Sequence, residues 1–311
     1  MNEKIPVWID TDTGVDDAGA LMTAFSFPEL DVTGISAVAG NVHLKDTFRN
    51  ARNVAYLCGR QDVKVYPGAE GPLFCELVTA EAVHGDNGIG NVTLPESPAP
   101  KETKKAWTAM YEKAKELKGE LQIIAVGPLT DLALAITTYP DFHVYVKRIL
   151  IMGGAAVGGN VTAAAEFNIH ADPEAAEIVF NSGIPVVMCG LDVTDKAVYP
   201  FEELDRVYET KDPRAVLLHD AYGVARPQYS TWTKGKGIRI HDANPVLYAV
   251  HPEIYHSEHC GVFVETQGLY TRGKTVTDLW SDQKFKERHV DVVLDVDVNA
   301  FCRYITDAVT K

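Results

Sequence analysis

The stretch VWIDTDTGVDDAGAL, residues 7–21, predicts both the fold of the chain and the position of its functional site. An apolar run leads to a glycine that allows a sharp turn, and a helical pattern follows. Four carboxylates lie around that turn, at Asp10, Asp12, Asp16 and Asp17. Acids this close repel each other unless a cation neutralises them, and carboxylate oxygens suit calcium or magnesium. The alternative for the last two is that acids are favoured in any first helical turn.

Outward from this segment, short apolar runs alternate with helical patterns over most of the chain. We expect strands at residues 5–9, 32–38, 121–126, 149–152 and 185–188, and helices at 16–27, 43–57, from 128, and at 173–181. This order predicts an α/β fold with a mostly parallel open sheet and helices on both faces, as in Rossmann-like proteins. On the first strand, Asp10 and Asp12 would point to the same side of the sheet. No low-complexity linker or internal repeat divides the chain, so we expect residues 1–311 to form one domain.

The charge balance argues against several classes of partner. The 311 residues hold 29 Lys and Arg against 43 Asp and Glu, a formal net charge of −14. Nucleic-acid binding relies on basic patches, so nucleic acid is not an expected partner. Hydrophobic residues make up 46% of the chain, which is enough for a large core. No apolar run approaches the ~18 residues of a membrane span, so no membrane association is expected.

Cysteine usage and the first residues indicate the compartment. The five cysteines are widely spread and form no C-x-x-C pair, as in proteins of a reducing compartment. The segment MNEKIPVWID lacks the basic region, the long apolar stretch and the cleavage site of a signal peptide. We therefore expect a cytoplasmic protein.

Two stretches interrupt the alternation of strands and helices. Residues 68–100 are rich in Gly and Pro, and residues 219–242 carry clustered aromatic and basic residues. Ligands of open parallel sheets bind at the carboxyl ends of the strands, where such loops gather. The second stretch is the candidate for a lid, and the alternative is simple packing of that loop. Its candidate ligand contacts are Tyr222, Arg226, Tyr229 and Trp232.

Polar groups also follow the later strands. The segment VGPLTD, residues 126–131, turns tightly into a helix and leaves the carbonyl group of Val126 free to face a metal. His241 and Asp242 begin an apolar helix, where the acid has an ordinary capping role as its alternative.

The segment GGNVTAAAEFNIHADPE, residues 158–174, follows another predicted strand. Its side chains at Asn160, Glu166 and Asn168 are of the types that hydrogen-bond sugar hydroxyls. The alternatives are a turn role for Asn160 and a helix-capping role for Asn168.

The segments DTDTGVDDA, AVAGN, AVHGDNGIG, AVGPLTD, MGG, GGN…EFNIHADPEAA and HDA, in this order, resemble the nucleoside hydrolase family of the inosine-uridine preferring N-ribohydrolase type. The likeness runs from residue 7 to about residue 251. It implies a calcium-dependent enzyme that hydrolyses the N-glycosidic bond of ribonucleosides, giving ribose and a free nucleobase.

The resemblance also implies which residues hold the metal. The calcium ligands would be the carboxylates of Asp12, Asp17 and Asp242 and the carbonyl oxygen of Val126. With Asp17 counted as bidentate, these residues supply about five oxygens and leave two or three of the ~6–8 calcium positions for a water and two sugar hydroxyls. Asp12 would also act as the general base that takes a proton from the attacking water.

The implied substrate-binding residues surround that metal. They are Asp16, Asn41, His84, Met152, Asn160, Glu166, Phe167, Asn168 and Tyr229. Asp16 and Asn41, together with Asn168, would share the 2′- and 3′-hydroxyls of the ribose. Asn160, Glu166 and Met152 would hold the 5′ side.

Two histidines are expected near the nucleobase. His241 is the second catalytic residue that the resemblance implies, either protonating the base or hydrogen-bonding to it. Its alternative is a buried histidine that orients Asp242. His84 would line the same pocket or serve a turn.

Three residues depart from the usual pattern of the family. Thr13 and Ala243 stand where proline is usual, and Asp131 stands where asparagine is usual. None of them removes a ligand, although Thr13 would relax the metal loop. The choice between purine and pyrimidine nucleosides stays open, and the resemblance implies a homodimer or a homotetramer.

Two other functions fit parts of the sequence. The run VWIDTDTG also suits a haloacid-dehalogenase-type phosphatase, in which Asp10 would be the nucleophile, Asp12 the acid and base, and magnesium the metal. That enzyme needs a later lysine and a further acidic pair, for which the chain offers no convincing candidates. The other alternative is a non-catalytic binding protein for ribose or nucleosides, which would need no general base at Asp12.

Overall fold

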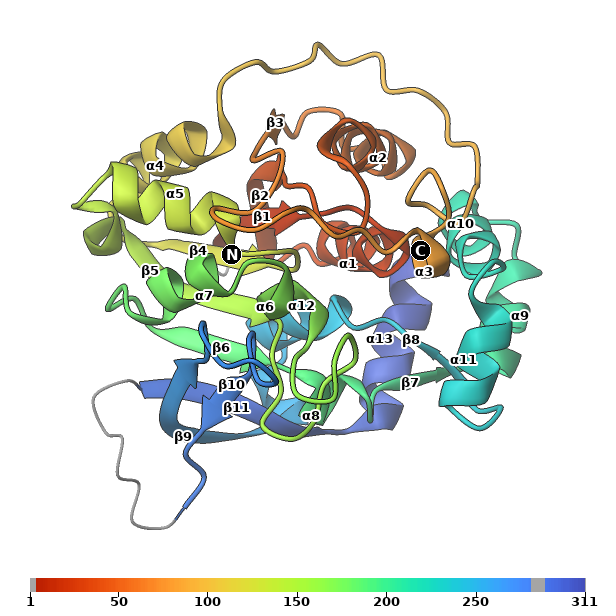
Figure 1. Cartoon of the computed structure of the whole chain (residues 1–311). Helices are drawn as coiled ribbons and strands as arrows, with labels where there is room; N and C mark the ends of the chain where they lie inside the picture. Colours follow the sequence, from red (N-terminus) through yellow and green to blue (C-terminus); the bar gives the residue numbers. More distant parts are fainter. Residues whose placement is uncertain (1–3, 281–288, 311) are drawn as a thin grey trace.

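A computed structural model describes residues 4–280 and 289–310 of the chain (Figure 1). Within these residues one sheet has the strand order β10-β9-β11-β6-β5-β4-β1-β2-β3. Its strands are β1 (Ile5–Thr11), β2 (Leu30–Ala37), β3 (Val65–Pro67), β4 (Leu121–Ala125), β5 (Val146–Met152), β6 (Val186–Cys189), β9 (Tyr255–Val264), β10 (Thr275–Thr277) and β11 (His289–Val296). All neighbours from β3 to β11 pair in parallel, and β9 is antiparallel to both β11 and β10. The predicted mostly parallel α/β sheet is confirmed.

Helices follow most strands, and a small second sheet pairs β7 (Val198–Pro200) with β8 (Gly237–Arg239) in antiparallel fashion. The α-helices are α1 (Val15–Ser26), α2 (Leu44–Leu57), α3 (Glu81–His84), α4 (Ala106–Glu116), α5 (Thr130–Thr138), α6 (Phe167–Ala171), α7 (Pro173–Phe180), α8 (Leu191–Thr194), α9 (Phe201–Tyr208), α10 (Pro213–Ala221), α11 (Arg226–Trp232), α12 (Ala243–Val250) and α13 (Val298–Thr310). Two short 3₁₀ helices, η1 (Phe142–Tyr145) and η2 (Pro252–Ile254), complete the described elements.

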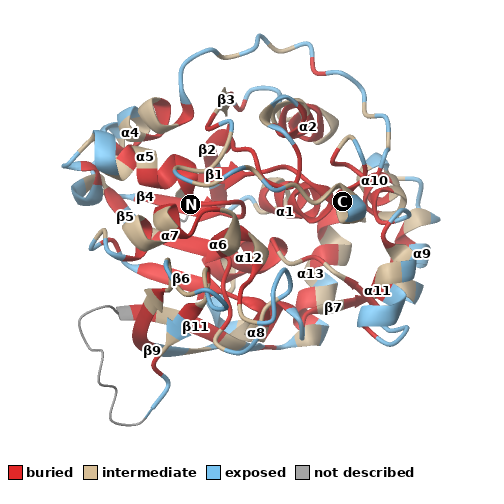
Figure 2. Ribbon diagram, viewed as in Figure 1, coloured by how far each residue is buried: buried red, intermediate tan, exposed pale blue. Residues whose placement is uncertain are grey.

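The main sheet separates two hydrophobic cores, as the alternation of side chains on its strands requires. Val7 and Ile9 of β1 pack into the core that α1, α2, α12 and α13 cover. Trp8, between them, packs into the opposite core beneath α4, α5 and α7. Figure 2 shows the buried residues running through the sheet between these helical layers. The prediction of helices on both faces is confirmed.

The first strand is longer than expected, and its end lies between the two acids Asp10 and Asp12. β1 continues to Thr11, so Asp10 lies in the strand and Asp12 lies beyond it. Strand alternation is therefore not defined for Asp12, and a common direction for the two carboxylates stays a prediction. Their partners differ, because Asp10 accepts a hydrogen bond from Ser36 and Asp12 accepts one from the backbone of Asn41.

The predicted lid is largely an ordered, packed segment. Residues 219–242 form the end of α10, all of α11 and the strand β8. Tyr222 is 1% exposed, and its hydroxyl donates to the carbonyl oxygen of Arg239 at 2.8 Å. Arg226 forms a bidentate pair with Asp205 at 2.7 and 2.8 Å. Packing of the loop, the alternative reading, is correct for Tyr222 and Arg226.

The fold brings the loops after β1, β2, β4 and β5 to one edge of the sheet, where α12 also begins. Among the described residues, no helix combines the length and the apolar character required to cross a membrane.

Candidate active site

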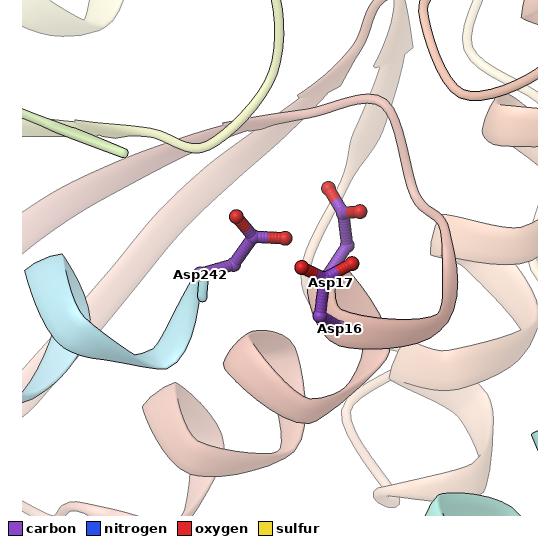
Figure 3. Close-up of side chains that lie close together, drawn as sticks. All are labelled: Asp16, Asp17 and Asp242. Atoms are coloured by element: carbon purple, nitrogen blue, oxygen red, sulfur yellow. The ribbon is translucent and has the colours of Figure 1, made fainter. Parts of the chain in front are cut away.

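Three buried carboxylates meet at the N-terminal ends of two helices (Figure 3). Asp16 and Asp17 lie in the first turn of α1, and Asp242 directly precedes α12. One oxygen of each lies within 4.8 Å of the others. The side chain of Asp242 makes no capping hydrogen bond to α12, so a simple capping role does not account for it. These oxygens form a cluster of hard ligands in a buried place.

Without a cation, this cluster is electrostatically unfavourable. Burial, and after it the charge of Asp17, raises the pKa of Asp16 to about 8. Burial and the charge of Asp16 raise the pKa of Asp242 well above its usual value. A divalent cation would remove both effects, because it replaces the lost hydration and neutralises the charges. The residues present therefore fit a metal ion.

The carboxylate of Asp17 is held in place by three donors. The hydroxyl of Thr11 donates to Oδ1 at 2.6 Å, and the backbone N–H of Gly14 donates to Oδ2 at 2.8 Å. The amide of Asn41 also donates to Oδ2, at 3.1 Å. Donors of this kind fix the direction in which a carboxylate presents its remaining lone pairs to a metal. Asn41 thus contacts an acid of the cluster as well as lining the cavity described below.

Asp12 lies beside this cluster with one oxygen unused. Its Oδ2 accepts the backbone N–H of Asn41 at 2.7 Å, whereas Oδ1 is buried and has no hydrogen-bond partner among the described residues. Burial, and then the charge of Asp17, raises the pKa of Asp12 well above its usual value. A Cβ atom on Gly127 would lie 2.8 Å from Oδ1, so only glycine leaves room there. An unpaired buried carboxylate oxygen marks a place for a metal or a water.

The carboxyl ends of β4 and β5 are linked by one side chain. Nδ2 of Asn168 donates to the carbonyl oxygen of Val126 at 2.9 Å and to that of Met152 at 3.0 Å. Asn168 lies within α6 rather than at its start, so the capping alternative for this residue is wrong.

Glu166 is the residue that caps α6. Its carboxylate accepts the backbone N–H groups of Asn168 and Gly154 at 2.9 Å and that of Ile169 at 3.2 Å. Burial outweighs these hydrogen bonds and raises the pKa of Glu166 to about 7. Asn160 accepts the backbone N–H of Phe167 at 2.9 Å, which is the turn role that its alternative described.

A cavity of about 530 Å³ opens over this constellation. The predicted residues that line it are Asp16, Asn41, His84, Val126, Met152, Asn160, Glu166, Phe167, Asn168, Tyr229, His241 and Asp242. The other two predicted ligands, Asp12 and Asp17, are fully buried rather than lining the cavity. The cavity lining therefore brings together predicted residues from eight segments that are distant in the sequence.

His84 and His241 both line the cavity, and each ring is held by a contact at its Nδ1 atom. Nδ1 of His84 accepts the backbone N–H of Val15 at 3.1 Å, at the start of α1. Nδ1 of His241 lies 2.8 Å from the hydroxyl of Thr194. Burial lowers the pKa of His84 to about 4 and that of His241 to about 3. Both rings are therefore neutral near pH 7, and each keeps Nε2 for another partner.

Several lining residues were not predicted from the sequence. They are Val78, Thr79, Ala80, Val83, Gly159, Val161, Asp195 and Arg239. Arg239 stands two residues before His241, and that spacing was an available signal. Asp195 carried no local signal, because only the end of α8 brings it to the cavity. Trp232, a predicted lid residue, does line the cavity.

Two of the residues that depart from the family pattern, Asp131 and Thr13, form hydrogen bonds with buried neighbours. Asp131 lies buried against Asp10, and its Oδ1 accepts the backbone N–H of Ala69 at 2.8 Å. Burial raises the pKa of Asp131 to about 7, so one proton can be shared within this acidic pair. The carbonyl oxygen of Thr13 accepts the amide of Asn50 at 3.1 Å, which anchors the metal loop.

Comparison with known proteins decides the family. The profile of the inosine-uridine preferring nucleoside hydrolases matches residues 7–303. The chain belongs to this family. It is accordingly an N-glycosyl hydrolase, and the phosphatase alternative is wrong. The structure agrees, since the Asp10 that a phosphatase would need as nucleophile is fully buried outside the cavity lining.

Relatives of this nucleoside hydrolase cover nearly the whole chain. This chain is 40% identical over 298 residues to the pyrimidine-specific ribonucleoside hydrolase RihA of Citrobacter koseri, and the match covers 96% of this chain and 95% of RihA. It is 36% identical to the non-specific ribonucleoside hydrolase RihC of Klebsiella pneumoniae, covering 98% of each chain. Among solved structures, a purine-preferring ribonucleoside hydrolase from Gardnerella vaginalis superposes with a TM-score of 0.90 at 32% identity, covering 98% of both chains. A plant nucleoside hydrolase gives a TM-score of 0.92 at 32% identity, also covering 98% of both.

Proposed function

We propose that this chain is a calcium-dependent hydrolase that cleaves ribonucleosides into ribose and a free nucleobase. The observation that carries the proposal is the buried cluster of Asp16, Asp17 and Asp242 beneath a cavity in a chain of this family. The oxygen-only donor set favours a hard cation, and its several carboxylates suit the high coordination number of calcium.

The residues that would hold calcium are Asp12, Asp17, Asp242 and the carbonyl oxygen of Val126. Asp16 is an additional candidate, because its carboxylate belongs to the same cluster. When bound, calcium supplies positive charge that orients two sugar hydroxyls and makes a water more acidic.

Asp12 would act as the general base. Its Oδ1 has no hydrogen-bond partner in the described structure, while Oδ2 is fixed by Asn41. An ionised Asp12 beside the cation would take a proton from the water that attacks C1′. Oδ1 is the atom that would receive the proton.

The ribose would be fixed at several points. Asp16, Asn41 and Asn168, which line the cavity, would contact the 2′- and 3′-hydroxyls. Glu166 and Asn160, with Met152 and Phe167 beside them, would hold the 5′ side. Positioning of this kind raises the rate because the sugar is held in the geometry of attack.

His241, Tyr229 and His84 would contact the nucleobase. The buried ring of His241 has a pKa lowered to about 3, which favours a hydrogen bond to the base over full protonation of it. Thr194 holds Nδ1, so Nε2 is the atom directed to that task.

The alternative of a non-catalytic binding protein for nucleosides predicts binding without turnover. The test is incubation of the purified protein with inosine, adenosine, uridine and cytidine in phosphate-free buffer containing calcium, followed by assay of ribose and free base. Equal release of the two products would support hydrolysis and exclude phosphorolysis. Binding of nucleosides by calorimetry with no release of either product would contradict the proposal.

Assembly and compartment belong to this proposal as well. The protein would act as a homodimer or homotetramer in the cytoplasm, where the five free cysteines stay reduced. Light scattering coupled to gel filtration measures the assembly, and a purely monomeric enzyme would contradict that part.

A further inference from the structure

Two neighbouring residue pairs hold one wall of the cavity together. The hydroxyl of Thr194 meets Nδ1 of His241 at 2.8 Å, and one residue further along, Oδ1 of Asp195 lies 3.3 Å from Nε of Arg239. Asp195 follows α8, and Arg239 ends β8, which pairs with β7 (Figure 1). Both members of the second pair line the cavity, yet the proposed chemistry does not use them.

Arg239 is held in place by its neighbours, but Asp195 does not occupy all the hydrogen-bond donors of its guanidinium group. Its backbone pairs with Val198 in the small sheet, and its carbonyl oxygen accepts the hydroxyl of Tyr222 at 2.8 Å. The side chain is 19% exposed, and Nε is buried without a well-aligned hydrogen bond. Among the described residues that line the cavity, it is the only lysine or arginine. A fixed guanidinium of this kind has donors left for a ligand.

The geometry of ribose places the nucleobase near Arg239. In a ribofuranose the base on C1′ and the 5′ arm on C4′ leave from opposite ends of the ring. If Glu166 and Asn160 hold the 5′ side, the base extends away from them, and the lining residues left to contact it include His241, Tyr229 and Arg239. The aromatic rings of Tyr229 and Trp232, 5.3 Å apart, line the same region and suit a flat base.

We infer that Arg239, positioned by Asp195, is a specificity-determining residue that recognises the C(=O)–N–H edge of an oxo-nucleobase such as uracil or hypoxanthine. This inference rests on the proposed function. The guanidinium donates to the carbonyl oxygen of the base, and the carboxylate of Asp195 accepts the adjacent ring N–H. In cytosine and adenine the corresponding edge carries a ring acceptor and an amino donor, so the polarity is inverted and these bases fit less well.

The same contact stabilises the departing base. Water adds to C1′ and loses a proton to Asp12, while the C1′–N bond breaks and its electron pair stays on the base. In an oxo-base this charge spreads onto the carbonyl oxygen, where Arg239 faces it. The base then takes up one proton from solvent and Asp12 releases its proton to solvent, so nucleoside and water give ribose and neutral base. Arg239 keeps its own protons throughout and acts by charge and hydrogen bonding.

The test compares Arg239→Met and Arg239→Lys on two substrates. With uridine, Arg239→Met should lower kcat/KM by about 10²-fold, mostly through kcat, as expected when a donor to developing charge is lost. With p-nitrophenyl β-D-ribofuranoside, whose leaving group departs as a stable anion, the loss should stay within about threefold. Arg239→Lys should be intermediate, because lysine retains the charge but not the planar fork.

Arg214→Met is the matched control. Arg214 is also 19% exposed and paired with an aspartate, Asp212, at 2.8 Å, but it lies on α10 outside the cavity lining. Its replacement should leave both substrates unaffected. Equal losses by Arg239→Met on uridine and on the nitrophenyl riboside, or no loss on either, would overturn the inference.

Asp195→Asn provides a second test, so the inference can still be tested if Arg239→Met does not fold. It should lower the ratio of kcat/KM for uridine over cytidine by about tenfold, because the acceptor for the ring N–H becomes ambiguous. An unchanged ratio would overturn the inference. Failure of the proposed function is distinguishable, since the wild-type protein with calcium would then release ribose from neither uridine nor the nitrophenyl riboside.

Discussion

The side-chain amide of Asn168 lies 2.9 Å from the carbonyl oxygen of Val126 and donates a hydrogen bond to it. The same amide donates to Met152, so one side chain joins α6 to the carboxyl ends of β4 and β5. A carbonyl oxygen has two lone pairs, and this contact occupies one of them. The other is left for a cation, so Asn168 orients a proposed metal ligand while it lines the cavity.

Replacing Asn168 with alanine should therefore weaken both the fold and the site. Two buried carbonyl groups would lose their donor, and the free energy of unfolding should fall by about 1–3 kcal/mol. We expect KM for nucleosides to rise as well, because a ribose contact is lost. Urea unfolding and steady-state kinetics measure the two effects. The matched control is Asn181→Ala, which removes an exposed amide at the end of α7; equal behaviour of the two variants would contradict the role of Asn168.

Thr11→Val tests the donors that hold Asp17. The change keeps the shape of the side chain but removes the hydroxyl that donates to Asp17 at 2.6 Å. Loss of such an orienting partner typically weakens metal binding about 10–100-fold. Titration calorimetry with calcium measures this, and Thr137→Val, on the partly exposed surface of α5, serves as the control. A calcium affinity equal to that of the wild type would show that Thr11 does not support the site.

Asp12→Asn separates a catalyst from a binding protein. The amide keeps the size of the side chain but cannot take a proton from water, so turnover should fall about 10²–10⁴-fold. With calcium at a concentration that saturates the variant, substrate affinity should change far less, because Asp12 lies outside the cavity lining and the added calcium offsets the weakened metal contact. Turnover is measured by ribose release and affinity by calorimetry, with Asp31→Asn on the exposed start of β2 as the control. Full activity in Asp12→Asn would remove it as the general base.

Ionisation of Glu166 should make kcat/KM for nucleosides depend on pH. Burial raises its pKa to about 7, so the side chain is protonated below that pH and ionised above it. The ionised form is the stronger acceptor for a 5′-hydroxyl, and kcat/KM for nucleosides should rise as the pH increases through about 7. Glu166→Gln should lose this rise, whereas Glu29→Gln, on the surface, should retain it. A rise of the same size in Glu166→Gln would assign it to another group.

The central part of the fold could be predicted because its signals are local. A buried apolar strand, a glycine turn and an acidic first helical turn lie in one stretch of sequence, and β1 and α1 appear there. The end of β1 could not be predicted as closely, because periodicity does not fix the ends of an element to within one or two residues. The strand continues to Thr11, two residues beyond the expected end, and so includes Asp10.

The outer wall of the cavity could not be predicted because its residues meet only through tertiary packing. Arg239 reaches the cavity through the pairing of β8 with β7, whose partner residues lie 37 to 41 positions apart in the sequence. Asp195 reaches it through the end of α8. The cluster of aromatic and basic residues around Tyr222 and Arg226 predicts a lid, yet Tyr222 packs in the core and Arg226 pairs with Asp205.

The measurement that tests the central claim most directly is ribose release from uridine and inosine in phosphate-free buffer, before chelation, after chelation and after calcium is added back. We predict release by the untreated enzyme, loss of release when the metal is removed, and recovery with calcium. Undiminished release by enzyme shown to be metal-free would contradict a metal-dependent mechanism at Asp12, Asp17 and Asp242. No release from any nucleoside with calcium shown to be bound would contradict the proposed function itself.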